Sequence, residues 1–180
     1  MVRHTAGLGL LAIYIGSIWA ANWLTTRYGL ITVAPGLVAT AGTFAVGGAI
    51  MTRDLLQDAL GRIAVLAAII TGAALSYATS SRQIAVASGI TFLLGESLEF
   101  GIYTPLRRRV GWGTRQWSAV IGAANVTGIT ADTFLFLWLA GFPVTLPVIA
   151  GQLTAKAYVT AACIGLGVTI RAVLRQPEHA

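Results

Sequence analysis

The 180-residue chain has the length of one domain, and 56% of its residues are hydrophobic while only 10% are charged. Soluble domains carry about 25% charged residues, so this composition excludes an ordinary soluble protein and indicates an integral membrane protein. The formal net charge of +6 does not indicate nucleic-acid binding, because the arginines lie in the breaks between apolar segments, where they set membrane topology.

Cysteine and histidine usage excludes further kinds of chemistry. Cys163 is the single cysteine, so the chain cannot form an internal disulfide. The histidines, His4 and His179, lie at opposite ends of the sequence, which removes imidazole-based metal sites and histidine-activated nucleophiles from the apolar region. Neither a G-x-S-x-G elbow nor a P-loop is present. We therefore expect no enzyme, no metal site and no cofactor.

Hydropathy predicts an all-α integral membrane protein, a single domain over residues 1–180 with six transmembrane helices. Turn residues such as Gly29, Gly141 and Pro143 separate the apolar runs. The first run has features of a signal peptide, but its length favours a retained helix. The expected spans are residues 6–24, 33–52, 63–79, 84–104, 117–140 and 144–173.

The arginines alternate between the connections. Nine lie at the N-terminus, in the second and fourth connections and at the C-terminus, whereas the other connections hold only Arg27 and Arg82. By the positive-inside rule, both termini are therefore cytoplasmic. Three helices per half would run in opposite orientations, as in transporters built from 3+3 inverted repeats, although the two halves show no strong sequence similarity.

Two acidic residues one helical turn apart, Asp54 and Asp58, follow the second span. Asp58 and Arg62 have the i,i+4 spacing of a surface ion pair, which is sufficient to explain both. Asp54 lies closer to the apolar run, where a charge is more costly. We therefore take Asp54 as a candidate site residue.

The fourth span contains Glu96 and Glu99, again one turn apart. Ser88, Phe92 and Tyr103 fall on the same helical face as the two glutamates. Two adjacent carboxylates cannot both stay ionised easily at low dielectric, so either one is protonated or the pair shares a cation. The one cation within the apolar segments is Lys156, in the sixth span.

The fifth span places Asn125 and Asp132 on one polar stripe of an otherwise apolar helix. A charge at mid-membrane costs at least ~2.5 kcal/mol, so such residues line a pathway or find a partner. A structural ion-pair cluster of Glu96, Glu99, Asp132 and Lys156 is the alternative. Buried ion pairs add little stability, so we favour a substrate or coupling-ion site.

These motifs resemble those of a known family. The segment Phe44–Arg62 is similar to the signature F…TD-x-x-[NA]-E-x-[YF]-G-[RK] of the VUT family, the vitamin-uptake-transporter-like queuosine precursor transporters. The run Gly95-Glu96-Ser-Leu-Glu99, the run Asp132-Thr-Phe-Leu-Phe136 and Lys156 resemble its later motifs. The chain departs from the family pattern in three places. Asp58 stands where glutamate is common, Glu99 stands where aspartate is common, and Gly47 and Gly48 replace a proline.

The resemblance implies a multi-pass transporter of the bacterial cell (inner) membrane whose substrate is a small, planar, purine-like 7-deazaguanine. Such a base presents N1–H and N2–H₂ donors side by side, which a carboxylate accepts as a pair. Glu96 or Glu99 is the candidate for this role, and Asn125 for the O6 side. Asp132 and Lys156 would set the local charge or relay a proton.

The alternative is the substrate-binding S component of an energy-coupling-factor vitamin transporter, which would require an ATPase partner. Such subunits dock through small residues on an early helix, and Ala12, Gly16 and Ala20 form a stripe of this kind. Ordinary helix packing explains the same stripe. A homodimer is compatible with either function.

Overall fold

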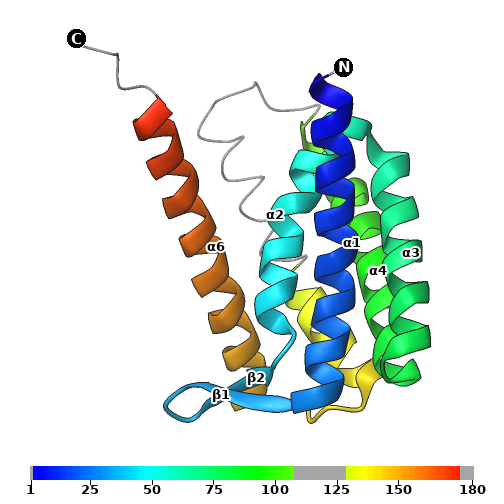
Figure 1. Ribbon diagram of the computed structural model, residues 1–180. Helices are drawn as coiled ribbons and strands as arrows, with labels where there is room; N and C mark the ends of the chain where they lie inside the picture. The colour runs from blue at the N-terminus through cyan, green and yellow to red at the C-terminus, as the bar shows by residue number, and fades with distance from the viewer. Residues whose placement is uncertain (1, 108–128, 175–180) are drawn as a thin grey trace.

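The computed structural model describes residues 2–107 and 129–174. The chain is mostly helical, with one short β-hairpin (Figure 1). The elements are α1 (Val2–Tyr28), β1 (Leu30–Ala34), β2 (Leu37–Thr40), α2 (Thr43–Leu60), α3 (Arg62–Thr79), α4 (Arg82–Arg107), the helical segment Ile129–Ala140 and α6 (Leu146–Leu174).

The helices run up and down between two ends of the molecule, and α6 stands beside the others (Figure 1). α1 begins and α6 ends at the upper end in this view, whereas the hairpin lies at the lower end. The α2–α3 connection, with Arg62, lies at the upper end, and Arg27 and Arg82 lie at helix ends near the hairpin. This distribution is compatible with an upper, cytoplasmic end, which stays a prediction.

The prediction for residues 33–52 is wrong in its first part. Residues 30–40 form an antiparallel hairpin in which Leu30 pairs with Thr40 and Thr32 with Val38, and α2 begins only at Thr43. Pro35 cannot donate a backbone hydrogen bond, and Gly36 adopts φ 72°, which turns the chain. Hydropathy alone cannot distinguish a short apolar strand from the start of a helix. The fold is therefore not all-α.

Two described helices, Gly7–Tyr28 and Arg62–Thr79, are long and apolar enough to cross a membrane by length and composition. The helical segment Ile129–Ala140 covers the second half of the fifth expected span, and its first half lies outside the described residues. Six spans and an inverted repeat stay predictions.

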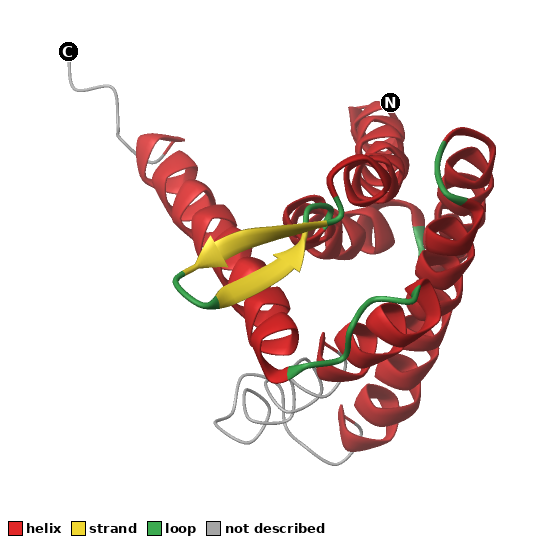
Figure 2. Cartoon of the chain, turned by 90° about the horizontal axis from the view of Figure 1, so that it is seen from below, coloured by secondary structure: helices red, strands yellow, loops and turns green. Residues whose placement is uncertain are grey.

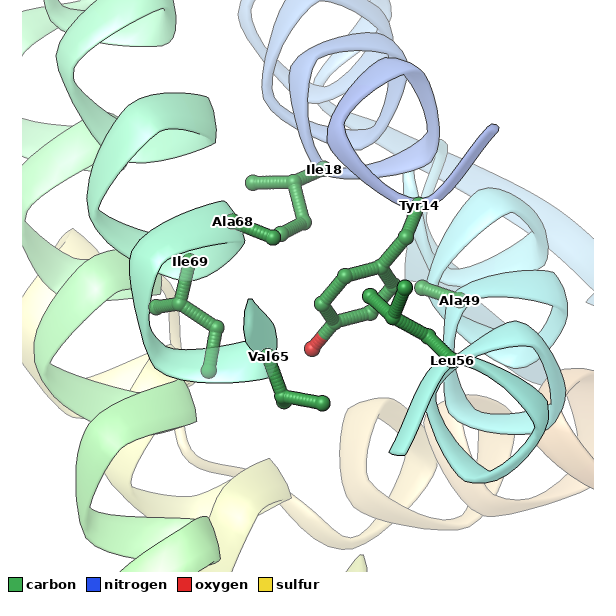
Figure 3. Packing of buried hydrophobic residues seen from close by; sticks show 7 residues of the cluster. All are labelled: Tyr14, Ile18, Ala49, Leu56, Val65, Ala68 and Ile69. Carbon is green, nitrogen blue, oxygen red and sulfur yellow. The ribbon is translucent and has the colours of Figure 1, made fainter. Parts of the chain in front are cut away.

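The apolar core lies among α1, α2 and α3 (Figure 3). Small residues let these helices approach closely, as at Gly72, where an added Cβ would lie 2.9 Å from the Ile18 side chain. Close packing of this kind is what holds helices together where lipid competes for apolar surface. The fully buried residues of this core are Tyr14, Ile18, Ala49, Leu56, Val65, Ala68 and Ile69.

Two glycines seat the hairpin against the helices. Gly151 of α6 lies directly against the backbone of Val38, and an added Cβ would overlap it. Gly42 lies equally close to the carbonyl oxygen of Ala21 and donates its N–H to Thr25 Oγ1 at 3.1 Å. Seen from below, the hairpin extends across the lower end to α6 (Figure 2). Thr40 is the last residue of β2 and Thr43 the first of α2. Both side chains hydrogen-bond to Gln152 of α6.

Candidate functional site

Buried polar side chains converge on one pocket near the hairpin end of the molecule. Three α1 residues line it, Ala21, Asn22 and Thr25, and Thr25 lies three residues before the end of the helix, about 4.5 Å along the axis. Each polar member is less than 5% exposed except Asp132, so this grouping is unusual for an apolar chain. We call it the polar pocket; it is lined by Ala21, Asn22, Thr25, Thr40, Gly42, Thr43, Val46, Ser88, Thr91, Phe92, Asp132, Thr133, Phe136, Gln152 and Lys156.

An ion pair lies in the polar pocket. Lys156 Nζ of α6 lies 2.5 Å from Asp132 Oδ2 and donates to Thr133 Oγ1 at 2.9 Å. The side chains of Lys156 and Asp132 are 5% and 21% exposed, respectively. The ammonium is thus almost completely removed from solvent, where it needs a counter-charge and hydrogen-bond acceptors. The site therefore combines one cation and one anion that are held together from two different helices.

A ring of hydrogen bonds joins the hairpin, α2 and α6. The Thr43 hydroxyl donates to Gln152 Oε1, Gln152 Nε2 donates to Thr40 Oγ1 at 3.0 Å, and the two threonine hydroxyls lie 2.9 Å apart. All three residues are 2% exposed. Because each polar group has a partner, the ring can be buried without the penalty of an unpaired donor or acceptor.

α1 and α4 complete the polar lining. Asn22 is 1% exposed and donates from Nδ2 to Ser76 Oγ at 3.0 Å. Thr91 of α4 bonds back to the Ala87 carbonyl at 2.7 Å. Phe92 and Phe136 add aromatic surface. The pocket consequently offers amides, hydroxyls, one ion pair and two phenyl rings, which is the composition of a site for a small polar molecule.

The cavity is small. The space that the centres of water molecules can occupy inside it is about 30 Å³. This is enough for about two waters. A purine-sized molecule would need the lining elements to separate. In the part of the chain that is described, no group of three or more His, Cys, Asp or Glu residues could hold a metal ion.

The structure brings two of the six candidate residues from the sequence together, Asp132 and Lys156. The sequence made Lys156 the cation available to Glu96 and Glu99 and also grouped it with Asp132, and Asp132 is its described partner. Glu96 and Glu99 lie on α4, and Asp54 lies on α2, but their side chains are outside the description. Asn125 falls in residues 108–128, which lie outside the described residues.

The predicted face of α4 is partly observed, because Ser88 and Phe92 both line the polar pocket. Sequence reasoning missed Gln152, although it precedes Lys156 by four residues and so shares its helical face. It also missed Asn22, the one amide in the first expected span. Thr40 and Thr43 were hidden because their segment was assigned to the interior of a span.

Comparison of the chain with protein-family models shows the family to which it belongs. A family model described as "Putative vitamin uptake transporter" matches residues 75–170, more than half of the chain. The chain belongs to this family. Together with the two long apolar helices, this membership makes it a membrane protein of a transporter family. No curated protein and no solved structure matches the chain.

The matched region includes α4, the segment Ile129–Ala140 and most of α6. It therefore contains Asp132, Gln152 and Lys156. The hairpin and α2, including Thr40 and Thr43, lie outside it, so the polar pocket joins residues from inside and outside the matched region.

Proposed function

We propose that the protein imports queuosine precursors, 7-deazaguanines such as 7-cyano-7-deazaguanine, across the bacterial inner membrane. The observation that carries the proposal is the buried Asp132–Lys156 pair, surrounded by hydroxyls and amides in a chain of a transporter family. Buried charges in apolar bundles are expensive and mark pathways. A purely structural pair would give little stability in return.

The chemistry of the pocket suits a flat base with hydrogen-bonding edges. Lys156 binds one oxygen of the Asp132 carboxylate, Oδ2, and the carboxylate is partly exposed. A carboxylate so placed accepts N1–H and N2–H₂ of a deazaguanine, and Glu96 and Glu99 remain further candidates for the same role. Phe92 and Phe136 line the pocket and supply aromatic surface next to it.

The position of the pocket supports import. It lies near the hairpin end, which the arginine distribution assigns to the outside of the cell. Loading from that side requires the hairpin or α6 to move, because the present cavity holds about two waters. Release requires opening at the other end, as in alternating access.

The test is rescue of queuosine in tRNA. The protein is expressed alone in a bacterium that can neither make nor import the precursor, and 7-cyano-7-deazaguanine or 7-aminomethyl-7-deazaguanine is supplied. We expect rescue by the wild type and loss of rescue with Asp132→Asn and with Glu96→Gln. No rescue by a protein shown to be present in the membrane would reject the proposed substrate.

A second candidate function is the S component of an energy-coupling-factor vitamin transporter. The observation that favours it is the bare face of α1, where Ala12 is exposed and an added Cβ at Gly16 would meet nothing within 4 Å. Rescue in a host that lacks the coupling ATPase would exclude this function. Rescue only when the ATPase module is supplied would establish it.

A further inference from the structure

The hydroxyl of Ser88 differs from the other hydroxyls of the polar pocket. Ser88 lines the pocket and is only 4% exposed. Within the part of the chain that the structure describes, its hydroxyl has no hydrogen-bond partner. Every threonine of the pocket, by contrast, takes part in at least one hydrogen bond. These threonines are Thr25, Thr40, Thr43, Thr91 and Thr133.

Ser88 also departs from the usual behaviour of a hydroxyl in a helix, which is to donate to the carbonyl four residues earlier. Thr91 of the same helix donates in this way to the Ala87 carbonyl at 2.7 Å. Ser97 donates to the Leu93 carbonyl at 2.8 Å. Ser88 makes no such bond within the described residues of α4, so its hydroxyl stays available to the cavity that it lines.

An unpaired hydroxyl is costly in a buried site. Ser80 Oγ shows the sealed case, since it is cut off from solvent and has no partner. Ser88 instead borders a cavity with space for about two waters, where a water or a ligand can pair with it. Alanine would avoid the desolvation and has the higher helix propensity. Stability alone therefore favours alanine at this position, and the hydroxyl calls for a ligand.

Ser88 adds a donor and an acceptor to the charges of the pocket. It belongs to α4, whereas Asp132 and Lys156 belong to the segment Ile129–Ala140 and to α6. The carboxylate only accepts hydrogen bonds and the ammonium only donates them, but a hydroxyl can do either. A molecule that is held by the carboxylate can thus be bound by a second helix through another of its polar atoms.

We infer that Ser88 is a substrate-binding residue whose hydroxyl forms a hydrogen bond with a polar atom of the transported molecule, separate from the N–H groups bound by Asp132. This inference rests on the proposed function. It has a consequence that a structural role would not have. Removal of the hydroxyl should weaken substrate binding without weakening the fold.

The experiment measures uptake of radiolabelled 7-cyano-7-deazaguanine in cells and the unfolding temperature of the purified protein in detergent. In Ser88→Ala we expect the KM for uptake to rise about tenfold, because a polar atom of the substrate loses its partner, with little change in the maximal rate. The unfolding temperature should stay the same or rise, since no hydrogen bond among the described residues is lost and alanine favours the helix.

Two further variants separate the hydroxyl from the size and place of the side chain. Ser88→Cys keeps the approximate size but has a thiol that forms only weak hydrogen bonds, so it should also raise KM. Ser97→Ala is the matched control, because it makes the same substitution in the same helix at an exposed position that does not line the polar pocket. It should leave KM unchanged.

An unchanged KM in Ser88→Ala overturns the inference and leaves the proposed function intact. A raised KM that comes with a lower unfolding temperature overturns it as well, because the hydroxyl would then support the fold. A normal KM in Ser88→Cys would mean that side-chain size matters and the hydroxyl does not. A wild-type protein that is present in the membrane and takes up no 7-cyano-7-deazaguanine overturns both the inference and the proposed function.

Discussion

The middle of α1 and its C-terminal end enter two different kinds of interior. Tyr14 and Ile18 pack into the apolar core with α2 and α3, whereas Asn22 and Thr25 line the polar pocket. The core uses three helices that follow one another in the sequence. The pocket joins residues as distant as Thr43 and Gln152, which are 109 positions apart. The core can thus form from adjacent helices, while the pocket exists only once α6 and the segment Ile129–Ala140 have docked.

The largest expected effect comes from Asp132→Asn. It leaves the Lys156 ammonium, whose side chain is 5% exposed, without its counter-charge, and breaking such a pair costs about 3–5 kcal/mol. Unfolding of the purified protein in detergent and uptake in cells should both report the loss. The double variant Asp132→Asn/Lys156→Met should recover stability but not uptake. Recovery of both would show that the pair is only structural.

Substitutions in the apolar core should lower the stability of the protein without changing the KM for uptake. Ile69 is fully buried and Ile70 is 60% exposed, so the two neighbours form a matched pair. Ile69→Ala should destabilise the protein by about 2 kcal/mol or more through lost packing, with an unchanged KM for uptake, and Ile70→Ala should have a much smaller effect on both. A change of KM in Ile69→Ala would mean that core and pocket are not separable.

The contact between the hairpin and α6 should affect both the stability of the protein and the polar pocket. Gly151→Ala places a methyl group against the Val38 backbone, and such overpacking costs about 1–3 kcal/mol. Because β2 carries Thr40, uptake should fall as well as the unfolding temperature. The control is Gly48→Ala in α2, where an added Cβ meets nothing within 4 Å; it should be neutral or stabilising. Equal behaviour of the two variants would contradict the seating role.

The smallest effect is expected on the bare face of α1. Gly16→Ala fills open space and should stabilise the helix by about 0.5–1 kcal/mol without changing uptake. A clear loss of uptake with normal stability would instead indicate that a partner docks on this face, as the S-component function requires.

Much of the helical pattern could be predicted from hydropathy, since the expected spans 63–79 and 84–104 lie within α3 and α4. The hairpin could not be predicted by that route, although Pro35-Gly36 between β-branched residues was a turn signal. For the site, Asp132 and Lys156 were identifiable because charges stand out in apolar segments. Thr40, Thr43 and Gln152 were not, because uncharged polar residues are common in apolar helices and acquire meaning only through their contacts.

The sequence by itself determined the class of protein, the apolar helices and the residues whose charge has to be accommodated, because hydropathy and charge are local properties of the chain. Only the tertiary structure decided that Lys156 pairs with Asp132 and that Gln152 meets two threonines of a hairpin. Those contacts depend on which helices become neighbours and on glycines that allow the backbones to touch. Neither condition can be read from the periodicity of a single segment.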